Sequence, residues 1–268
     1  MGRPNHQGTS NLRGGAYRVL KDAYVRASLR LARPVSREIH DDVSRIVERH
    51  TNRQMRHTHA VARESYRQVE ALVGLYSTLG FTLPLPPMRG YALSPDAAVE
   101  IVRLIHESRP STILELGSGV STLITAYALR RFGGGRVISL EHDAAWHEIA
   151  TGYIVEHDLS DYAEVRYAPL EEIEIQGHPW KWYDPSALQG IDSVDMLVVD
   201  GPPRSTQPLA RYPALPLVGH LLTHEAMIVL DDTVREDERS IIRIWDSESG
   251  PFRIEEFAAE KGLTVMRR

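Results

Sequence analysis

The feature that most constrains the fold is the segment STILELGSGVST, residues 111–122. An apolar run leads directly into a glycine-rich turn and then into small hydroxyl residues. Similar short apolar runs recur along the chain and predict strands at residues 111–116, 136–141, 163–167, 194–200 and 226–231. Helical patterns lie between them, at residues 120–132, 143–156, 205–222 and 236–247. Nearly all-apolar strands such as DMLVVD are typical of a parallel sheet covered on both faces. The alternation therefore predicts an α/β fold.

The two ends of the chain differ from this alternation. At the C-terminus, FRIEEFAAE and LTVMRR flank a Lys-Gly turn and predict two antiparallel strands that close the sheet. At the N-terminus we expect a disordered tail over residues 1–15 and a helical region over residues 16–87. The connector FTLPLPPMRGY is rich in proline and separates this region from the α/β domain, which we place at residues 88–268.

Composition narrows the classes of function. The 268 residues include no cysteine, which excludes disulfides, thiolate metal sites and cysteine nucleophiles. No apolar run is long enough for a membrane span, and the N-terminus lacks a signal-peptide pattern, so we expect a cytoplasmic protein without a membrane partner.

Charge is distributed unevenly along the chain. Residues 1–70 hold 14 Lys and Arg against 7 Asp and Glu, while the remainder holds 17 against 29. A basic arm on an acidic body can indicate an anionic partner. The arm lacks the lysine and arginine blocks with interleaved aromatic residues that nucleic-acid binding favours. We therefore expect the arm to dock on its own body or on a second subunit, giving a homodimer through the N-terminal helical region.

The glycine turn has three possible interpretations: a phosphate-binding turn, a nucleoside-binding turn or an ordinary tight turn. A phosphate-binding loop requires a lysine, which the segment does not contain. A dinucleotide fold requires a third glycine, and Thr122 stands in its place. Gly117 and Gly119 allow the backbone to approach a ligand, and Glu115 in front of them favours a cationic ligand over a pyrophosphate. Ser121 and Thr122 begin a helix whose free N–H groups would face that ligand.

With these residues in order, the chain resembles the class I S-adenosylmethionine-dependent methyltransferases. Their first motif is an acidic residue followed by Gly-x-Gly, as in ILELGSGVST, and their second is the acid that ends the next strand, here Glu141. The resemblance implies a doubly wound, mostly parallel, seven-stranded Rossmann-like sheet over about residues 88–268. It also implies S-adenosylmethionine as cofactor, with Glu141 gripping the ribose hydroxyls and His142 against the adenine. The implied cofactor residues are Glu115, Gly117, Ser118, Gly119, Ser121, Thr122, Glu141, His142 and Asp200.

Three acidic residues follow two later strands. Asp200 ends DMLVVD, and Asp231 and Asp232 end AMIVLDD. Neighbouring parallel strands lie about 4.8 Å apart, so these carboxylates can converge at one edge of the sheet. Such a cluster suits Mg²⁺, which prefers oxygen ligands. The alternative is that the aspartate pair only caps a helix and hydrogen-bonds a loop.

The cluster resembles that of the metal-dependent O-methyltransferases, which use an Asp at the fourth strand and an Asp-Asn pair at the fifth. Asp232 departs from that pattern, and so does the absence of a lysine shortly after Asp200. The resemblance implies Asp200 as a catalytic residue facing the methyl group. A base would then be His142, with His224 as a weaker candidate, or a bound metal would lower the pKa of the hydroxyl.

The methyl acceptor is the least constrained part of the prediction. The segment HPWKWYDP, residues 178–185, carries Trp180, Trp182 and Tyr183, which either stack on a sugar or aromatic acceptor or pack locally. The DGPP segment with this tryptophan loop resembles bacterial sugar and polysaccharide methyltransferases, so we expect a sugar or oligosaccharide hydroxyl as acceptor. Phenolic or macrolide natural products are the alternative. A scaffold protein that only binds the cofactor, a nicotinamide dehydrogenase and a nucleic-acid methyltransferase also stay open.

Overall fold

The computed structural model describes residues 10–88, 90 and 92–268, without the side chains of residues 10–17, 29, 31–41 and 43. The chain divides into two compact units, residues 1–63 and residues 64–268, and each is described by itself. Of the predicted tail, residues 1–15, the first nine residues lie outside the described residues. Residues 10–15 are helical instead, because adding turns to a helix that has already nucleated costs little.

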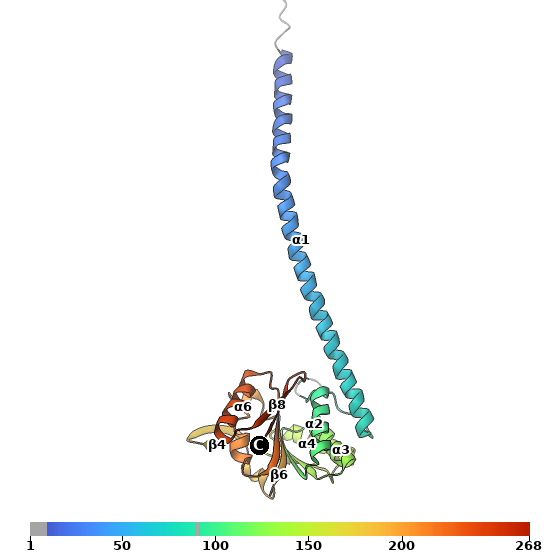
Figure 1. Ribbon diagram of the computed structural model, residues 1–268, viewed down its shortest axis with the longest axis vertical. Coiled ribbons are helices and arrows are strands. Elements are labelled where there is room, and N and C mark those ends of the chain that lie inside the picture. The colour runs from blue at the N-terminus through green and yellow to red at the C-terminus, as the bar shows by residue number, and fades with distance from the viewer. Residues whose placement is uncertain (1–9, 89, 91) are drawn as a thin grey trace, which may run out of the picture. The chain divides into compact units, whose positions relative to one another are not determined.

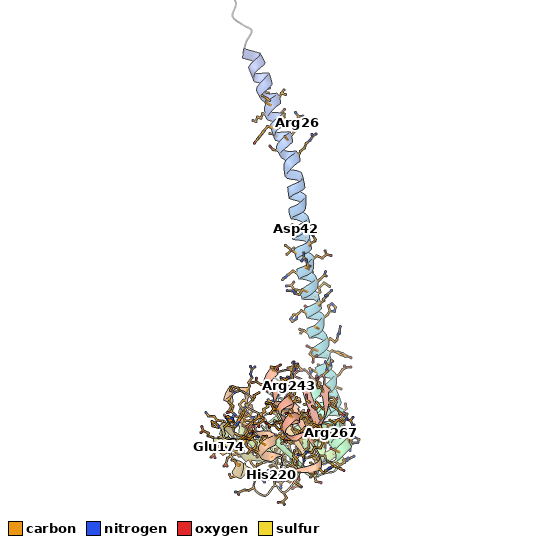
Figure 2. All side chains as sticks on the ribbon, turned by 60° about the vertical axis from the view of Figure 1, so that its left-hand side comes forward. Arg26, Asp42, Glu174, His220, Arg243 and Arg267 are labelled. Carbon is orange, nitrogen blue, oxygen red and sulfur yellow. The ribbon has the colours of Figure 1, made fainter. Side chains whose placement is uncertain are left out.

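The described residues of the first unit are helical. Helix α1 spans Ser10–Leu79, and its residues up to Arg63 belong to this unit. Figure 2 shows the side chains around Arg26 and Asp42 standing out from the helix, in keeping with their exposure. Among the described residues, no helix combines the length and the apolar character needed to cross a bilayer.

The second unit starts inside the same helix. Leu75 and Leu79 are buried in its core, although the sequence placed the α/β domain from residue 88 onward. The connector after the helix packs on this core too, through Phe81, Leu85 and Met88. The α/β unit therefore includes the last turns of α1.

The α/β unit contains nine strands and five further α-helices among its described residues. The strands are β1 (Thr112–Leu116), β2 (Arg136–Glu141), β3 (Ala163–Tyr167), β4 (Leu170–Ile175), β5 (His178–Tyr183), β6 (Val194–Val199), β7 (Leu222–Asp231), β8 (Arg253–Phe257) and β9 (Leu263–Arg267). The helices are α2 (Pro95–Ser108), α3 (Val120–Phe132), α4 (Ala144–Glu156), α5 (Ala214–Val218) and α6 (Glu236–Ser249), with short 3₁₀ turns at Pro185–Leu188 and Arg204–Thr206.

Seven strands form one sheet in the order β3-β2-β1-β6-β7-β9-β8. The first five are parallel to one another, and β9 pairs antiparallel with both β7 and β8. The predicted doubly wound, mostly parallel sheet with a terminal antiparallel pair is thereby confirmed. Strand order reverses between β1 and β6, and such a switch point is where ligands bind in open α/β sheets.

Two hydrophobic cores cover the two faces of the sheet. Adjacent residues of β1 show this, because Ile113 belongs to one core and Leu114 to the other. The first core holds α2 and α3, and the second holds Trp182 of β5 and Trp245 of α6. Figure 1 accordingly shows α2, α3 and α4 on one side of the sheet and α6 and β4 on the other.

Two predicted segments differ in the structure. Residues 205–222 are not one helix, because Pro208 and Pro213 interrupt the run and leave the end of a 3₁₀ turn and the short helix α5. The HPWKWYDP segment is not a loop, because its first six residues form β5, which pairs antiparallel with β4. The turn between these strands, Gln176-Gly177, has positive φ at both residues, the backbone of a tight hairpin turn.

Candidate active site

The glycine turn lies at the carboxyl end of β1, beside the end of β6. Gly117 has φ of 96°, and a Cβ on it would stand 3.4 Å from the backbone nitrogen of Gly201. The backbone N–H of Gly117 donates to the carbonyl of Leu140 on β2. The turn is thus held between the central strands, and α3 begins directly after Gly119.

Glu115 lies beneath this turn, with 1% of its surface exposed. One carboxylate oxygen accepts hydrogen bonds from the hydroxyls of Thr122 and Ser139. Burial raises the pKa of Glu115, and the two hydroxyl hydrogen bonds offset only part of that rise. The Glu115 carboxylate therefore links β1 to α3 and to β2. Together with Thr122 it stabilises the glycine turn on its buried side.

Glu141 is the acid at the end of β2, and it meets the glycine turn. Its Oε2 accepts from the backbone N–H of Ser118 at 3.1 Å and from the Ser118 hydroxyl at 2.8 Å. Its Oε1 accepts from the N–H of Asp143 and lies 3.0 Å from Nδ1 of His142. Burial alone would raise the pKa of Glu141, but hydrogen bonds from His142, Asp143 and Ser118 outweigh it and lower the pKa to about 2. The side chain is an ionised acceptor beside the turn.

Three aspartates converge at the ends of β6 and β7. Asp200, Asp231 and Asp232 each offer an oxygen, and these three oxygens lie within 4.8 Å of one another. Asp231 and Asp232 are 1% and 4% exposed. Neither carboxylate oxygen of Asp231 accepts a hydrogen bond from a described residue. The predicted convergence of the three acids is present in the structure.

Arg211 lies among these acids, and sequence reasoning missed it. Its guanidinium donates to Oδ1 of Asp200 at 3.0 Å and to Oδ2 of Asp232 at 2.7 Å. It also donates to the backbone carbonyl of Asp231 at 2.8 Å. The signal was an arginine within the apolar run PLARYPALP, because arginine is almost never buried unless it is paired. Arg211 orients two of the acids and leaves Asp231 without a partner.

Two further charged residues complete the cluster. Arg235 lies 2.7 Å from Oδ2 of Asp232, and Glu238, which is 3% exposed, lies 3.8 Å from Arg211. Four carboxylates therefore meet two guanidinium groups. With every group ionised the cluster carries a charge of −2, which one divalent cation would neutralise.

Burial together with this excess of negative charge raises the pKa of Asp200 and of Asp231. Burial and the neighbouring charge of Asp231 raise the pKa of Asp200 well above its usual value. Burial and the charge of Asp232 raise the pKa of Asp231 to about 6. The orphaned oxygens of Asp231, the oxygen-only donor set and the residual charge all fit a hard cation such as Mg²⁺.

The tryptophan segment, residues 178–185, is packed into the protein and does not form an open surface for an acceptor. Trp182 and Tyr183 are fully buried, and the Tyr183 hydroxyl accepts or donates no hydrogen bond among the described residues. That hydroxyl stands 2.1 Å from where a Cβ on Gly201 would lie, so only glycine fits at position 201. Trp180 keeps partial exposure and packs on the ring of Tyr212, with 4.9 Å between centroids. Local packing is thus the role of Trp182 and Tyr183.

His224, considered as a base, lies far from the site. It is near the start of β7, seven residues before Asp231, and roughly 3.3 Å per residue places it about 23 Å away along the strand. His142, by contrast, directly follows Glu141 and has a side chain 30% exposed. Of the two histidines, only His142 lies at the ligand-binding edge of the sheet.

The comparisons with known proteins agree with this geometry. Residues 114–233 match a family model described as a methyltransferase domain, and this span contains the glycine turn, Glu141 and all three aspartates. These residues therefore form a methyltransferase domain, which confirms the predicted enzyme class. No curated protein sequence matched the chain.

Several solved structures have a fold similar to that of this chain. The Podospora anserina methyltransferase PaMTH1 bound to S-adenosylhomocysteine has a TM-score of 0.54 at 13% identity, over 78% of this chain and 94% of that chain. An O-methyltransferase from Bacillus cereus in complex with S-adenosylhomocysteine has a TM-score of 0.52 at 18% identity, over 77% and 97%. The O-methyltransferase TomG from Streptomyces achromogenes, involved in tomaymycin synthesis, has a TM-score of 0.51 at 17% identity, over 77% and 95%.

Proposed function

We propose that this methyltransferase transfers a methyl group to a hydroxyl of a sugar or oligosaccharide, with assistance from a divalent cation, in the first place Mg²⁺. The observation that carries the proposal is the cluster of Asp200, Asp231 and Asp232 at the ligand-binding edge of the sheet, beside the glycine turn. Three of the structural neighbours are described as O-methyltransferases, from Bacillus cereus, Streptomyces achromogenes and Klebsiella pneumoniae.

The cofactor binds over the glycine turn in this proposal. Glu141 accepts the two ribose hydroxyls, for which an ionised carboxylate is the stronger acceptor. Because Ser118 already donates to that carboxylate, its hydroxyl is the group that must yield when the ribose arrives. The backbone from Gly117 to Gly119 then passes close to the methionine part, with no side chain in between.

Asp200 and Asp231 would hold the cation, with Asp232 beside them. Asp232 is engaged by both Arg211 and Arg235, so it orients the cluster more than it offers a free oxygen. Bound there, the cation would lower the pKa of the acceptor hydroxyl and fix its position. Arg211 meanwhile keeps Asp200 in place through its backbone carbonyl and its side chain.

His142 is our candidate for the base that takes the hydroxyl proton. Its Nδ1 faces Glu141 at 3.0 Å, so the tautomer with the proton on Nδ1 leaves Nε2 as an acceptor. A histidine in that state can accept a proton from a hydroxyl held within hydrogen-bond reach. Glu141 would then both grip the ribose and orient the base.

The acceptor class is supported by the resemblance of the DGPP segment to sugar methyltransferases. Of the three aromatic side chains considered for stacking, only Trp180 keeps the exposure that contact with an acceptor ring requires. A phenolic or macrolide acceptor is the alternative, and the same carboxylate cluster would serve it.

A methyl-transfer assay with labelled S-adenosylmethionine tests the proposal. Methyl glycosides and short oligosaccharides are compared with catechols and macrolides, each with Mg²⁺ and with EDTA. We expect label in the glycosides with Mg²⁺ and little in EDTA. Full activity in EDTA would remove the metal, and label only in catechols or macrolides would remove the sugar.

Matched variants separate the roles of the residues. Asp200→Ala and Asp231→Ala should lose transfer but still bind S-adenosylhomocysteine in a calorimetric titration. Asp192→Ala, at an exposed aspartate before β6, is the control and should keep both properties. Tight S-adenosylhomocysteine binding with every acceptor inactive would instead indicate a protein that only binds the cofactor.

A further inference from the structure

The last turns of α1 carry exposed apolar side chains along one face. Tyr66, Val69 and Val73 are 64%, 57% and 59% exposed, and Tyr76, which is 41% exposed, packs in part on Phe81 of the connector. Their steps of three, four and three residues place all four along one side of the helix. Contiguous exposed apolar side chains often mark an interaction surface, so we expect a partner to cover the stripe.

The same turns contact their own domain through a different face. Leu75 and Leu79 are 1% and 4% exposed and belong to the first core. At about 100° per residue, these two leucines point roughly 120° away from the exposed stripe around the helix axis. Folding of the α/β unit therefore uses another side of the helix and leaves Tyr66, Val69 and Val73 of the stripe in solvent.

The spacing of the stripe continues upstream along α1. Counting back in sevens from Tyr76 and Val69 gives Ala62 and Met55, and both side chains are exposed. Counting back from Tyr66 gives His59. A stripe of two positions in seven is narrower than the apolar face of a helix that packs on a globular core. It matches the seam through which two helices pair as a coiled coil.

We propose that this seam, defined by His59, Ala62, Tyr66, Val69, Val73 and Tyr76, pairs with the same seam of a second copy of the chain in an antiparallel coiled coil. Tyr66 of one copy then lies opposite Val69 of the other, and Ala62 lies opposite Val73. The arrangement has two-fold symmetry, so every contact occurs twice.

Charge selects both the partner and the orientation. Arg63 and Glu70 are exposed and flank the seam at equivalent positions, seven residues apart. In the antiparallel arrangement Arg63 of each copy lies beside Glu70 of the other, giving two opposite-charge pairs. A parallel pair would not place these opposite charges together.

Sedimentation equilibrium of the full chain tests the seam. We expect the wild type at micromolar concentration to sediment as a dimer of the 30.2 kDa chain. The double variant Val69→Glu, Val73→Glu should sediment as a monomer, with a dimer dissociation constant raised at least 100-fold. Val61→Glu is the matched control, because Val61 is 51% exposed but lies off the seam. It should remain a dimer.

Charge reversal tests the antiparallel orientation. Arg63→Glu and Glu70→Arg should each weaken the dimer about 10-fold or more, and the double variant Arg63→Glu, Glu70→Arg should restore it. Circular dichroism and S-adenosylhomocysteine affinity, unchanged in all variants, would show that the α/β unit is still folded. A monomeric wild type, a dimer that persists in Val69→Glu, Val73→Glu, or a charge swap without restoration would each overturn the proposal.

Discussion

Asp231→Asn should make the metal-free protein more stable. Burial and the charge of Asp232 raise the pKa of Asp231 from 3.8 to about 6, and neither of its oxygens has a hydrogen-bond partner among the described residues. At about 1.4 kcal/mol per pKa unit, the rise corresponds to a folding penalty of roughly 3 kcal/mol once the carboxylate is ionised. Asparagine of nearly the same shape removes that charge.

The pH dependence of this penalty follows from the protonation state of Asp231 that the folded protein favours. The folded pKa lies above the unfolded one, so the penalty is absent below about pH 3.8 and grows between there and pH 6. Above about pH 6 the penalty is complete. The stability gain of Asp231→Asn over wild type should therefore be largest at pH 8, smaller at pH 5 and close to zero near pH 4.

Urea unfolding in EDTA at these three pH values measures the effect. Asp232→Asn is the control, because Asp232 is paired with Arg211 and Arg235 and its loss removes both of these short ion pairs. That variant should lose stability rather than gain it. Adding Mg²⁺ should stabilise the wild type and have no effect on Asp231→Asn. An Asp231→Asn protein less stable than wild type at pH 8 would refute the reasoning.

Three further outcomes follow from the site and its surroundings. Glu141→Gln should weaken S-adenosylhomocysteine binding about 10- to 100-fold in calorimetry, since charge-assisted hydrogen bonds are worth about 1.5–3 kcal/mol. Gly201→Ala should unfold at a lower temperature, because its Cβ would stand 2.1 Å from the Tyr183 hydroxyl, and Tyr183→Phe should suppress that loss. Burial lowers the pKa of His157, so the wild type should lose stability as the pH falls below about 6.5, and His157→Gln should lose less. An equally steep acid limb in His157→Gln would contradict the last expectation.

The sequence was sufficient for the sheet and the acids at its edge. Parallel strands end at one edge, so the residues after each apolar run could be placed together, as Asp200 and Asp231 show. The position of Arg211 among the acids could not be predicted in this way. Arg211 comes from a proline-interrupted segment where no periodicity applies, and its partners Asp200 and Asp231 lie at the ends of two strands, β6 and β7.

The hairpin of β4 and β5 was missed for a different reason. Its strands alternate weakly, and Trp182 and Tyr183 were assigned to a polar loop, although both are buried in the second core. The Gln176-Gly177 turn was the available signal, since a two-residue turn ending in glycine favours a hairpin. Side-chain direction on such a hairpin depends on tertiary packing, which local sequence does not encode.

The central claim is that the glycine turn, Glu141 and the aspartate cluster together form one methyl-transfer site. A crystal structure with S-adenosylhomocysteine and Mn²⁺, with the metal placed by its anomalous signal, tests this most directly. The account predicts the ribose hydroxyls on Glu141 and a manganese peak between Asp200 and Asp231. A ribose held elsewhere, or a fully bound cofactor with no manganese at those two aspartates, would contradict it.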